Sequence, residues 1–236
     1  MPDGFLFYPG YYMGYYSYLI YLLPAIIISL IAQFRVKSAF SKYSNILCNI
    51  SGAEAARRVL EANGVTGVSI ERVQGSLTDH YDPRTNVIRL SETVYDTRSI
   101  AAVGVAAHEA GHAVQYAKRW APIRLRGAIL PVCQIGSSLS WPLFFIGIMF
   151  SMPFLVDLGI VFFCAALFFQ ILTLPVEFNA SKRAISAIRT DNILTAEDDI
   201  RGAKKVLSAA AMTYVASVIM SLLQLLRLLS MARRRR

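Results

Sequence analysis

Three long stretches of this 236-residue chain are almost free of charged side chains, and they restrict its fold more than any other feature. Residues 4–34 and 206–226 have none, and between Arg126 and Glu177 only Asp157 is charged. A helix needs about 20 apolar residues to cross the hydrocarbon core of a bilayer. The first and last stretches are each long enough for one crossing, and the middle one suits a hairpin of two. We therefore expect a mostly α-helical membrane protein with about four hydrophobic segments.

Basic residues outnumber acidic ones, with 24 lysines and arginines against 15 aspartates and glutamates. Such an excess can indicate nucleic-acid binding, but no nucleic-acid-binding motif is present. The basic residues gather beside the apolar stretches, which is typical of membrane-flanking charge. Arg35, Lys37 and Lys42 follow the first stretch, so the positive-inside rule places the N-terminus outside and the following segment in the cytoplasm. Basic residues flank both ends of the last stretch, and whether it crosses the membrane stays open.

A segment of soluble character follows the first hydrophobic stretch. Ser51 and Glu54 have the pattern of an N-terminal capping box, and Gly64 ends the helix that they begin. Residues 68–73 and 86–91 alternate apolar and polar side chains, as half-buried strands do. The sequence therefore predicts a small α+β domain with a short antiparallel sheet. A strand of this sheet could bind an extended substrate, or the hairpin could be purely structural.

The motif His108-Glu109-Ala110-Gly111-His112 lies in a segment that has the pattern of one continuous helix. Histidines four positions apart lie on one helix face and can bind a single Zn²⁺, and Glu109 between them can act on a water molecule. The same spacing can arise by coincidence on an amphipathic helix. The chain has only three histidines, however, and two of them fall in the motif, which favours a zinc-dependent peptidase.

A catalytic zinc ion needs three protein ligands, and the motif supplies two. The candidates for the third are His80, the carboxylates between the motif and Asn192, and above all Glu177. If the apolar stretch before Glu177 crosses the membrane twice, this carboxylate returns to the side on which the motif lies. The alternative is a surface charge that pairs with Lys182 or Arg183.

These features divide the chain into five parts. They are the N-terminal region with the first transmembrane helix (1–34), a cytoplasmic zinc-peptidase domain (35–126), a transmembrane helical hairpin (127–176), a cytoplasmic segment with the third ligand (177–205), and a C-terminal hydrophobic helix with a basic tail (206–236). The three cysteines form no C-x-x-C pair, so neither a disulfide framework nor a thiolate metal site is predicted.

Three runs of residues resemble a known family, namely H-E-A-G-H-A-V-Q at 108–115, L-T-D-H-Y-D-P at 77–83 and P-V-E-F-N-A-S at 175–181. Together they are similar to the YugP-like membrane zinc metallopeptidases, over nearly the whole chain after the first hydrophobic stretch. The layout also resembles the CAAX prenyl-protease and HtpX-type membrane peptidases. The resemblance implies a zincin-like domain whose zinc ligands are His108, His112 and Glu177.

The chain departs from the wider family pattern at two positions. Ser181 stands four residues after Glu177, where related gluzincins carry an aspartate that supports a zinc-bound histidine. Asn179 stands where the YugP-like pattern has an aspartate. Ser181, Asn179 and Asp79 are therefore candidates to orient the histidines instead.

These residues predict a membrane-anchored zinc endopeptidase whose site faces the cytoplasm at the cell membrane, with Glu109 as general base. His80 and Tyr81 are candidates to donate a hydrogen bond to the oxyanion, and Arg183 is a weaker third choice. His80 could equally be a hydrogen-bonded turn residue. The expected partners are the lipid bilayer and protein or peptide substrates, with no nucleic acid. The natural substrate and the oligomeric state stay open.

Two other functions fit part of the sequence. A site-2-type intramembrane protease would carry its motif in a membrane helix, whereas this motif lies in a polar segment and no Asp-Gly motif follows in a later apolar stretch. A non-catalytic membrane scaffold could keep zinc for structure alone. Such a site needs no general base, and the presence of Glu109 therefore favours the enzyme.

Overall fold

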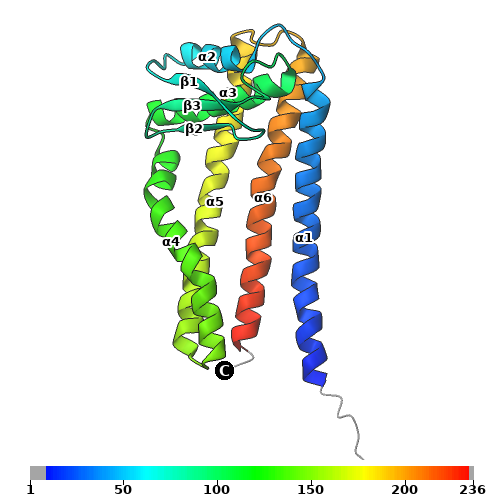
Figure 1. The fold of residues 1–236 in the computed structure, drawn as a ribbon, viewed down its shortest axis with the longest axis vertical. Helices are drawn as coiled ribbons and strands as arrows, with labels where there is room; N and C mark the ends of the chain where they lie inside the picture. Colours follow the sequence, from blue (N-terminus) through cyan, green and yellow to red (C-terminus); the bar gives the residue numbers. More distant parts are fainter. Residues whose placement is uncertain (1–8, 234–236) are drawn as a thin grey trace, which may run out of the picture. The chain divides into compact units, whose positions relative to one another are not determined.

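The computed structural model describes residues 9–233, with side chains from Ile20 onward. The last three arginines of the predicted basic tail lie outside this range. Most described residues are helical (Figure 1). In chain order the elements are α1 (Pro9–Ser44), α2 (Gly52–Ala62), β1 (Ser69–Val73), β2 (His80–Asp82), β3 (Val87–Ser91), α3 (Ile100–Ala117), α4 (Ala121–Met149), α5 (Pro153–Thr190) and α6 (Glu197–Arg233).

Four of the described helices are long and apolar enough to cross a membrane, as the sequence predicted. They are the Ile20–Ser44 part of α1, and the whole of α4, α5 and α6. One boundary differs from expectation, because α5 does not end near Glu177 but continues to Thr190. Beyond Glu177 its Ala180, Ala184 and Ile188 repeat every four residues and are fully buried. This apolar face packs in a protein core, and the packing extends the helix.

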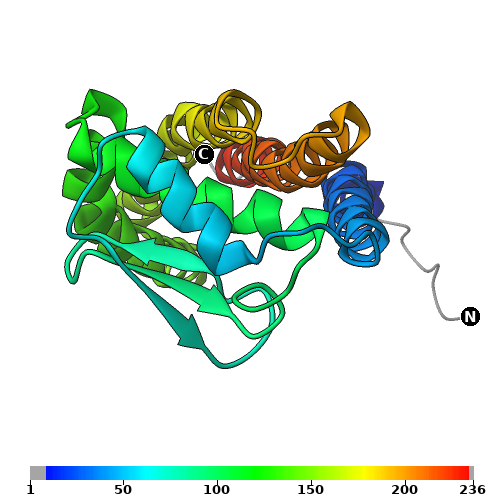
Figure 2. The ribbon, with the colours of Figure 1, turned by 90° about the horizontal axis from the view of Figure 1, so that it is seen from above.

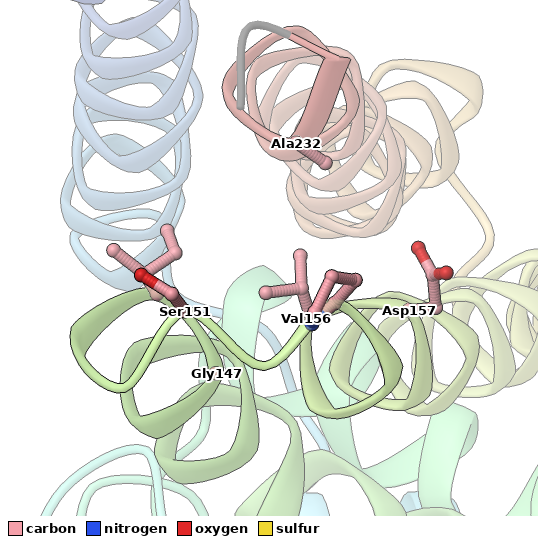
Figure 3. Close-up of a pocket in the computed structure, with 7 residues that line it drawn as sticks. Gly147, Ser151, Val156, Asp157 and Ala232 are labelled. Atoms are coloured by element: carbon pink, nitrogen blue, oxygen red, sulfur yellow. The ribbon is translucent and has the colours of Figure 1, made fainter. Parts of the chain in front are cut away.

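The chain divides into two compact units. The sheet-bearing unit consists of residues 32–131 and 169–215. The second unit consists of residues 1–31, 132–168 and 216–236, and we call it the all-helical unit because its described residues form helices and one short turn. The all-helical unit has a small apolar core made of Phe144, Val156, Ile160 and Leu228. A cavity of about 350 Å³ lies in the same unit (Figure 3), with a lining that includes Gly147, Ser151, Val156, Asp157 and Ala232.

The sheet has three strands in the order β1-β3-β2. The two predicted strands are present, but β1 pairs with β3 in parallel, and only β2 and β3 are antiparallel. The burial of the strands explains this arrangement. Four of the five β3 residues are buried, whereas β1 and β2 contain none that is fully buried. The most apolar strand therefore takes the centre, and β2 is left as an edge strand.

Helices α2 and α3 cover one face of the sheet (Figure 2). Segments of α5 and α6 lie beyond α3 within the same unit. The sequence predicted the start of α2 correctly, because the Ser51 hydroxyl accepts a hydrogen bond from the Glu54 amide. Ser99 caps α3 in the same way, through the Ala102 amide. Alanine and glycine make up half of α3, and these small side chains let its neighbours approach closely.

Of the two glycines of α3, Gly111 inside the metal-binding motif has the closer neighbour. A Cβ atom at this position would lie 2.7 Å from the backbone oxygen of Ala180 on α5. No side chain larger than hydrogen fits there without displacing backbone. The glycine therefore brings the part of α5 that carries Glu177 directly against the motif.

Candidate metal centre and active site

The three predicted ligands lie together in the sheet-bearing unit. His108 and His112 stand one turn apart on α3, with ring centroids 4.7 Å apart, and Glu177 faces them from α5. The Glu177 Oε2 atom lies 3.2 Å from His108 Nε2 and 3.5 Å from His112 Nε2. One ligand atom from each residue falls within 4.8 Å of the others. Residues 69 positions apart thus form one cluster of a size that a single ion can bridge.

A buried amide fixes the orientation of the His112 ring. The Gln115 Nε2 atom donates to the Val176 carbonyl at 2.8 Å and to Asn179 Oδ1 at 3.0 Å. Its Oε1 atom is therefore the acceptor for His112 Nδ1, at 3.0 Å. In the neutral ring Nδ1 carries the proton, and Nε2, which faces Glu177, keeps the lone pair that a metal ion needs.

Ser181 orients the imidazole of His108 in the same way. Its hydroxyl lies 3.1 Å from His108 Nδ1, four residues beyond Glu177 on the same helix. Of the three candidates that the sequence offered for this supporting role, Ser181 contacts a histidine directly and Asn179 acts through Gln115. Asp79 does neither, since its carboxylate accepts hydrogen bonds from the amide and hydroxyl of Ser91.

Glu109 is held by the edge of the sheet. Its Oε2 atom accepts a hydrogen bond of 3.0 Å from the backbone N–H of Tyr81 on β2. This contact ties the motif helix to the edge strand and occupies the N–H of Tyr81. The carboxylate of the motif and the edge strand therefore lie side by side.

An open cavity of about 310 Å³ gives access to these groups. Its polar lining consists of Asp79, His80, Tyr81, His108, Glu109, His112, Tyr116, Arg126, Glu177 and Tyr214. A second cavity of about 160 Å³ shares Asp79, His108, Glu109, Glu177 and Tyr214. All lining residues of both cavities belong to the sheet-bearing unit. The site is thus a concave surface with several convergent polar groups, as binding sites usually are.

His80 and Tyr81, the predicted oxyanion donors, both line the larger cavity. The Nδ1 atom of His80 lies 2.8 Å from the Thr78 carbonyl, which can only accept, so Nδ1 carries the proton and Nε2 of the neutral ring is an acceptor. The Tyr81 hydroxyl donates to Asn86 Oδ1 at 2.6 Å, and burial raises the pKa of this phenol. Arg183, the weaker candidate, donates to Asn179 Oδ1 at 2.7 Å and does not line the cavity.

Gln115, Arg126 and Tyr214 are among the residues of the site that were not identified from the sequence. Gln115 had a detectable signal, because it follows His112 by three positions on one helix. Arg126 lies in the basic segment after α3, and its Nη2 atom is 3.9 Å from Glu177 Oε1. Tyr214 lies in an apolar stretch that gives no sign of a polar site, yet it faces Glu177 and Glu109.

The donor set fits zinc. Two imidazole nitrogens and one carboxylate oxygen are typical of a catalytic zinc site with an open fourth position. The charges of the surrounding carboxylates also suit a bound cation. Burial lowers the pKa of His112, but the hydrogen bond to Glu177 and the charges of Glu109 and Glu177 raise it more, so the net pKa lies above the usual value. The carboxylates therefore favour positive charge at this place.

Comparison with known proteins also points to zinc. Residues 18–233 match a family described as "Putative neutral zinc metallopeptidase". The chain belongs to this family. It is 48% identical over 207 residues to the "Putative membrane protease YugP" of Bacillus subtilis (strain 168), which covers 87% of this chain and 92% of the relative. No solved structure matches the chain. Family membership and the four apolar helices identify a membrane protein of the zinc metallopeptidase class.

Proposed function

We propose that the chain is a membrane-anchored endopeptidase that uses zinc held by His108, His112 and Glu177, with Glu109 as the general base. The convergence of these three ligands beside Glu109 carries the proposal. Family membership supports the same class of activity.

The residues of the site have distinct tasks in this mechanism. When bound, Zn²⁺ supplies a Lewis acid that polarises the scissile carbonyl and makes water a better nucleophile near neutral pH. Glu109 takes the proton of the attacking water and passes it to the leaving amine nitrogen. The Tyr81 N–H holds one oxygen of this carboxylate and so fixes its direction. Gln115 and Ser181 keep the two imidazole rings in their ligand orientations.

Hydrolysis also needs a donor for the oxyanion of the tetrahedral intermediate. His80 could donate only with a second ring proton, because its Nδ1–H already meets the Thr78 carbonyl, and Arg126 and Tyr214 join His80 and Tyr81 as candidates that line the cavity. Arg126 is well suited because its Nε atom is buried and meets no hydrogen-bond partner among the described residues. Tyr214 faces the same cavity from α6 and can donate its phenolic proton. Tyr81 is the least available of the four, since Asn86 already accepts its proton.

The edge strand β2 suggests how a peptide is held. An extended segment can pair with the outer edge of β2, where backbone hydrogen bonds give affinity for many sequences. Residues of β2 line the cavity, so a peptide paired there would pass close to Glu109. We propose protein or peptide substrates that lie close to the membrane, with the site on the cytoplasmic side of the cell membrane.

The substitution Glu109→Gln tests catalysis. We expect the purified variant to keep its zinc and to lose peptide cleavage by at least about a hundredfold, because a general base contributes that much or more. Zinc content is measured by elemental analysis, and cleavage is measured with a fluorogenic or protein substrate. Undiminished cleavage, or undiminished function in a cell-based assay, would favour the scaffold that holds zinc for structure alone.

The substitutions Glu177→Ala and His80→Ala form a matched pair for the third ligand. Both residues line the cavity, but only Glu177 faces both imidazoles. We expect Glu177→Ala to reduce zinc content sharply and His80→Ala to leave it unchanged. The opposite result would reject the ligand assignment.

A further inference from the structure

A groove between α1 and α6 has no part in the proposed chemistry. It encloses about 450 Å³ and is lined by Phe34, Arg35, Ser38, Ala39, Lys42, Tyr43, Lys205, Ser208, Ala209 and Met212. All of these residues belong to the sheet-bearing unit. None of them lines either cavity of the metal centre. The groove is therefore a separate feature of that unit.

Three cations converge on this groove. Arg35 and Lys42 reach it from α1, and Lys205 reaches it from α6. No carboxylate is among the lining residues, and within the described part of the chain none of the three cations forms an ion pair. The Lys42 ammonium lies 5.6 Å from the centre of the Tyr43 ring, a cation–π contact that supplies no negative charge. Two lining serines add hydroxyl donors. This combination suits a phosphate group.

The groove lies at the polar ends of two membrane segments. Phe34 is the last residue of the charge-free stretch 4–34, and Lys205 directly precedes the charge-free stretch 206–226. The lining also contains large exposed apolar side chains, since Phe34 is 73% and Met212 is 44% exposed. A ligand of this groove thus meets cations and hydroxyls together with apolar surface that continues along the helices.

We propose that the groove binds the headgroup of an anionic phospholipid. Arg35, Lys42 and Lys205 neutralise the phosphate, and the acyl chains run along Phe34 and Met212. Basic pockets between transmembrane helices are suited to lipids of this class. A free phosphate ion uses only the polar part of the groove and leaves the apolar side chains exposed. A lipid fills the polar part with its phosphate and covers the apolar part with its acyl chains.

Neighbouring lysines provide a matched control. Lys37 on α1 and Lys204 on α6 are exposed and adjacent in sequence to groove residues, but neither lines the groove. The variants Arg35→Gln/Lys205→Gln and Lys37→Gln/Lys204→Gln remove the same charge from the same two helices. General attraction between a basic surface and anionic lipid is weakened equally in both, whereas a defined site is weakened only in the first.

The experiment uses the full-length protein in detergent micelles that contain equimolar phosphatidylglycerol and phosphatidylcholine. Native mass spectrometry measures the fraction of protein that retains each lipid. We expect wild type to retain phosphatidylglycerol selectively. The groove variant should lose this retention by roughly tenfold or more, since each cation near an anionic lipid surface contributes about 1 kcal/mol. The Lys37/Lys204 variant should retain the lipid as wild type does.

Two further measurements test whether the ligand enters the groove and whether it is a lipid or a free phosphate ion. Ala209→Phe fills the groove without changing its charge, and it should reduce lipid retention if the headgroup enters the groove. Excess inorganic phosphate should not displace the lipid, and displacement would show a site for free phosphate instead. Equal loss in the two charge variants, or no loss in the groove variant, would reject the proposal.

Discussion

Both imidazoles of the metal centre are fixed through the nitrogen that faces away from Glu177. Gln115 holds Nδ1 of His112, and Ser181 holds Nδ1 of His108. The two supports differ in burial, since Gln115 is completely buried and also anchors α5 through the Val176 carbonyl. Because a histidine ligand binds a metal through a lone pair, the partner on its other nitrogen sets both tautomer and direction.

Removing either support should weaken zinc binding while all three ligands remain. We expect Gln115→Met, which keeps a similar volume, and Ser181→Ala to lower zinc affinity by about 10–100-fold each. The affinity is measured by competition with a chromophoric chelator. The thermal midpoint of each metal-free variant is the control, because a general loss of folding would lower it. Wild-type affinity in both variants would contradict the supporting role.

At the residue scale, local spacing predicted the motif and the count of membrane crossings predicted Glu177, but neither predicted all of their surroundings. His108 and His112 share a helix face, so their proximity follows from the sequence alone. Arg126 and Tyr214 lie on α4 and α6 and meet the site only through tertiary packing. The sequence around Tyr214 is apolar, and its pattern gives no reason to assign the tyrosine to a polar site.

At the scale of elements, the contact between α3 and α5 decides whether the site is assembled. Gly111 and Gly104 both lie on α3, and they differ in the room around them. A Cβ atom at Gly111 would meet backbone of Ala180 at 2.7 Å, whereas one at Gly104 would meet Ala203 at an ordinary 3.6 Å. The two glycines therefore allow a comparison of the same substitution on one helix.

Gly111→Ala should push α5 away from the motif and separate Glu177 from the histidines. We expect a loss of about 1–3 kcal/mol in stability, as for other overpacked sites, together with weaker zinc binding. Gly104→Ala should be neutral or stabilising, since alanine favours the helix by about 1 kcal/mol over glycine. Thermal unfolding and zinc titration of the two variants provide the measurement. Equal behaviour of the pair would show that the contact does not position Glu177.

The turn between β2 and β3 responds to pH through Asp82. The Arg84 amide, the Thr85 hydroxyl and the Arg89 guanidinium all donate to its carboxylate, and they hold its pKa below the usual range. A lowered folded-state pKa stabilises the fold above the unfolded pKa of about 4, and this contribution is lost as the pH falls further. The turn therefore loses stability in acid.

Asp82→Asn should lower the thermal midpoint at neutral pH, and the difference from wild type should shrink as the pH falls below about 4. Unfolding of the detergent-solubilised protein is followed by circular dichroism over this pH range. Glu61→Gln is the control, because Glu61 is exposed and forms no ion pair in the described part of the chain. A constant difference for Asp82→Asn across the range would exclude the carboxylate as the cause.

The strands illustrate what the sequence could and could not predict about elements. Alternating side chains correctly indicated β1 and β3. The predicted antiparallel pairing of these two strands was wrong, because the intervening three-residue strand β2 is too short to give a periodic pattern. Once β2 forms the hairpin with β3, the buried β3 is central and β1 can only join its other edge in parallel.

At the scale of the whole molecule, the membrane segments and the site share the same helices. The 38-residue helix α5 is roughly 57 Å long at about 1.5 Å per residue, which exceeds the thickness of a bilayer. Counting crossings from sequence placed Glu177 on the side of the motif. The continuation of α5 to Thr190 could not be foreseen, because its polar segment becomes helical through burial of one face.

The orientation of α5 in the cell membrane is the last prediction. Met152 lies between α4 and α5 and is exposed, and Lys182 is exposed near the other end of α5. Single cysteines at these positions, in a chain whose three native cysteines are replaced, report their side with a membrane-impermeant maleimide. The positive-inside rule predicts that Met152→Cys is labelled on intact cells and Lys182→Cys only after permeabilisation. The reversed pattern would place the site outside the cytoplasm, and labelling of both positions on intact cells would show that α5 does not cross.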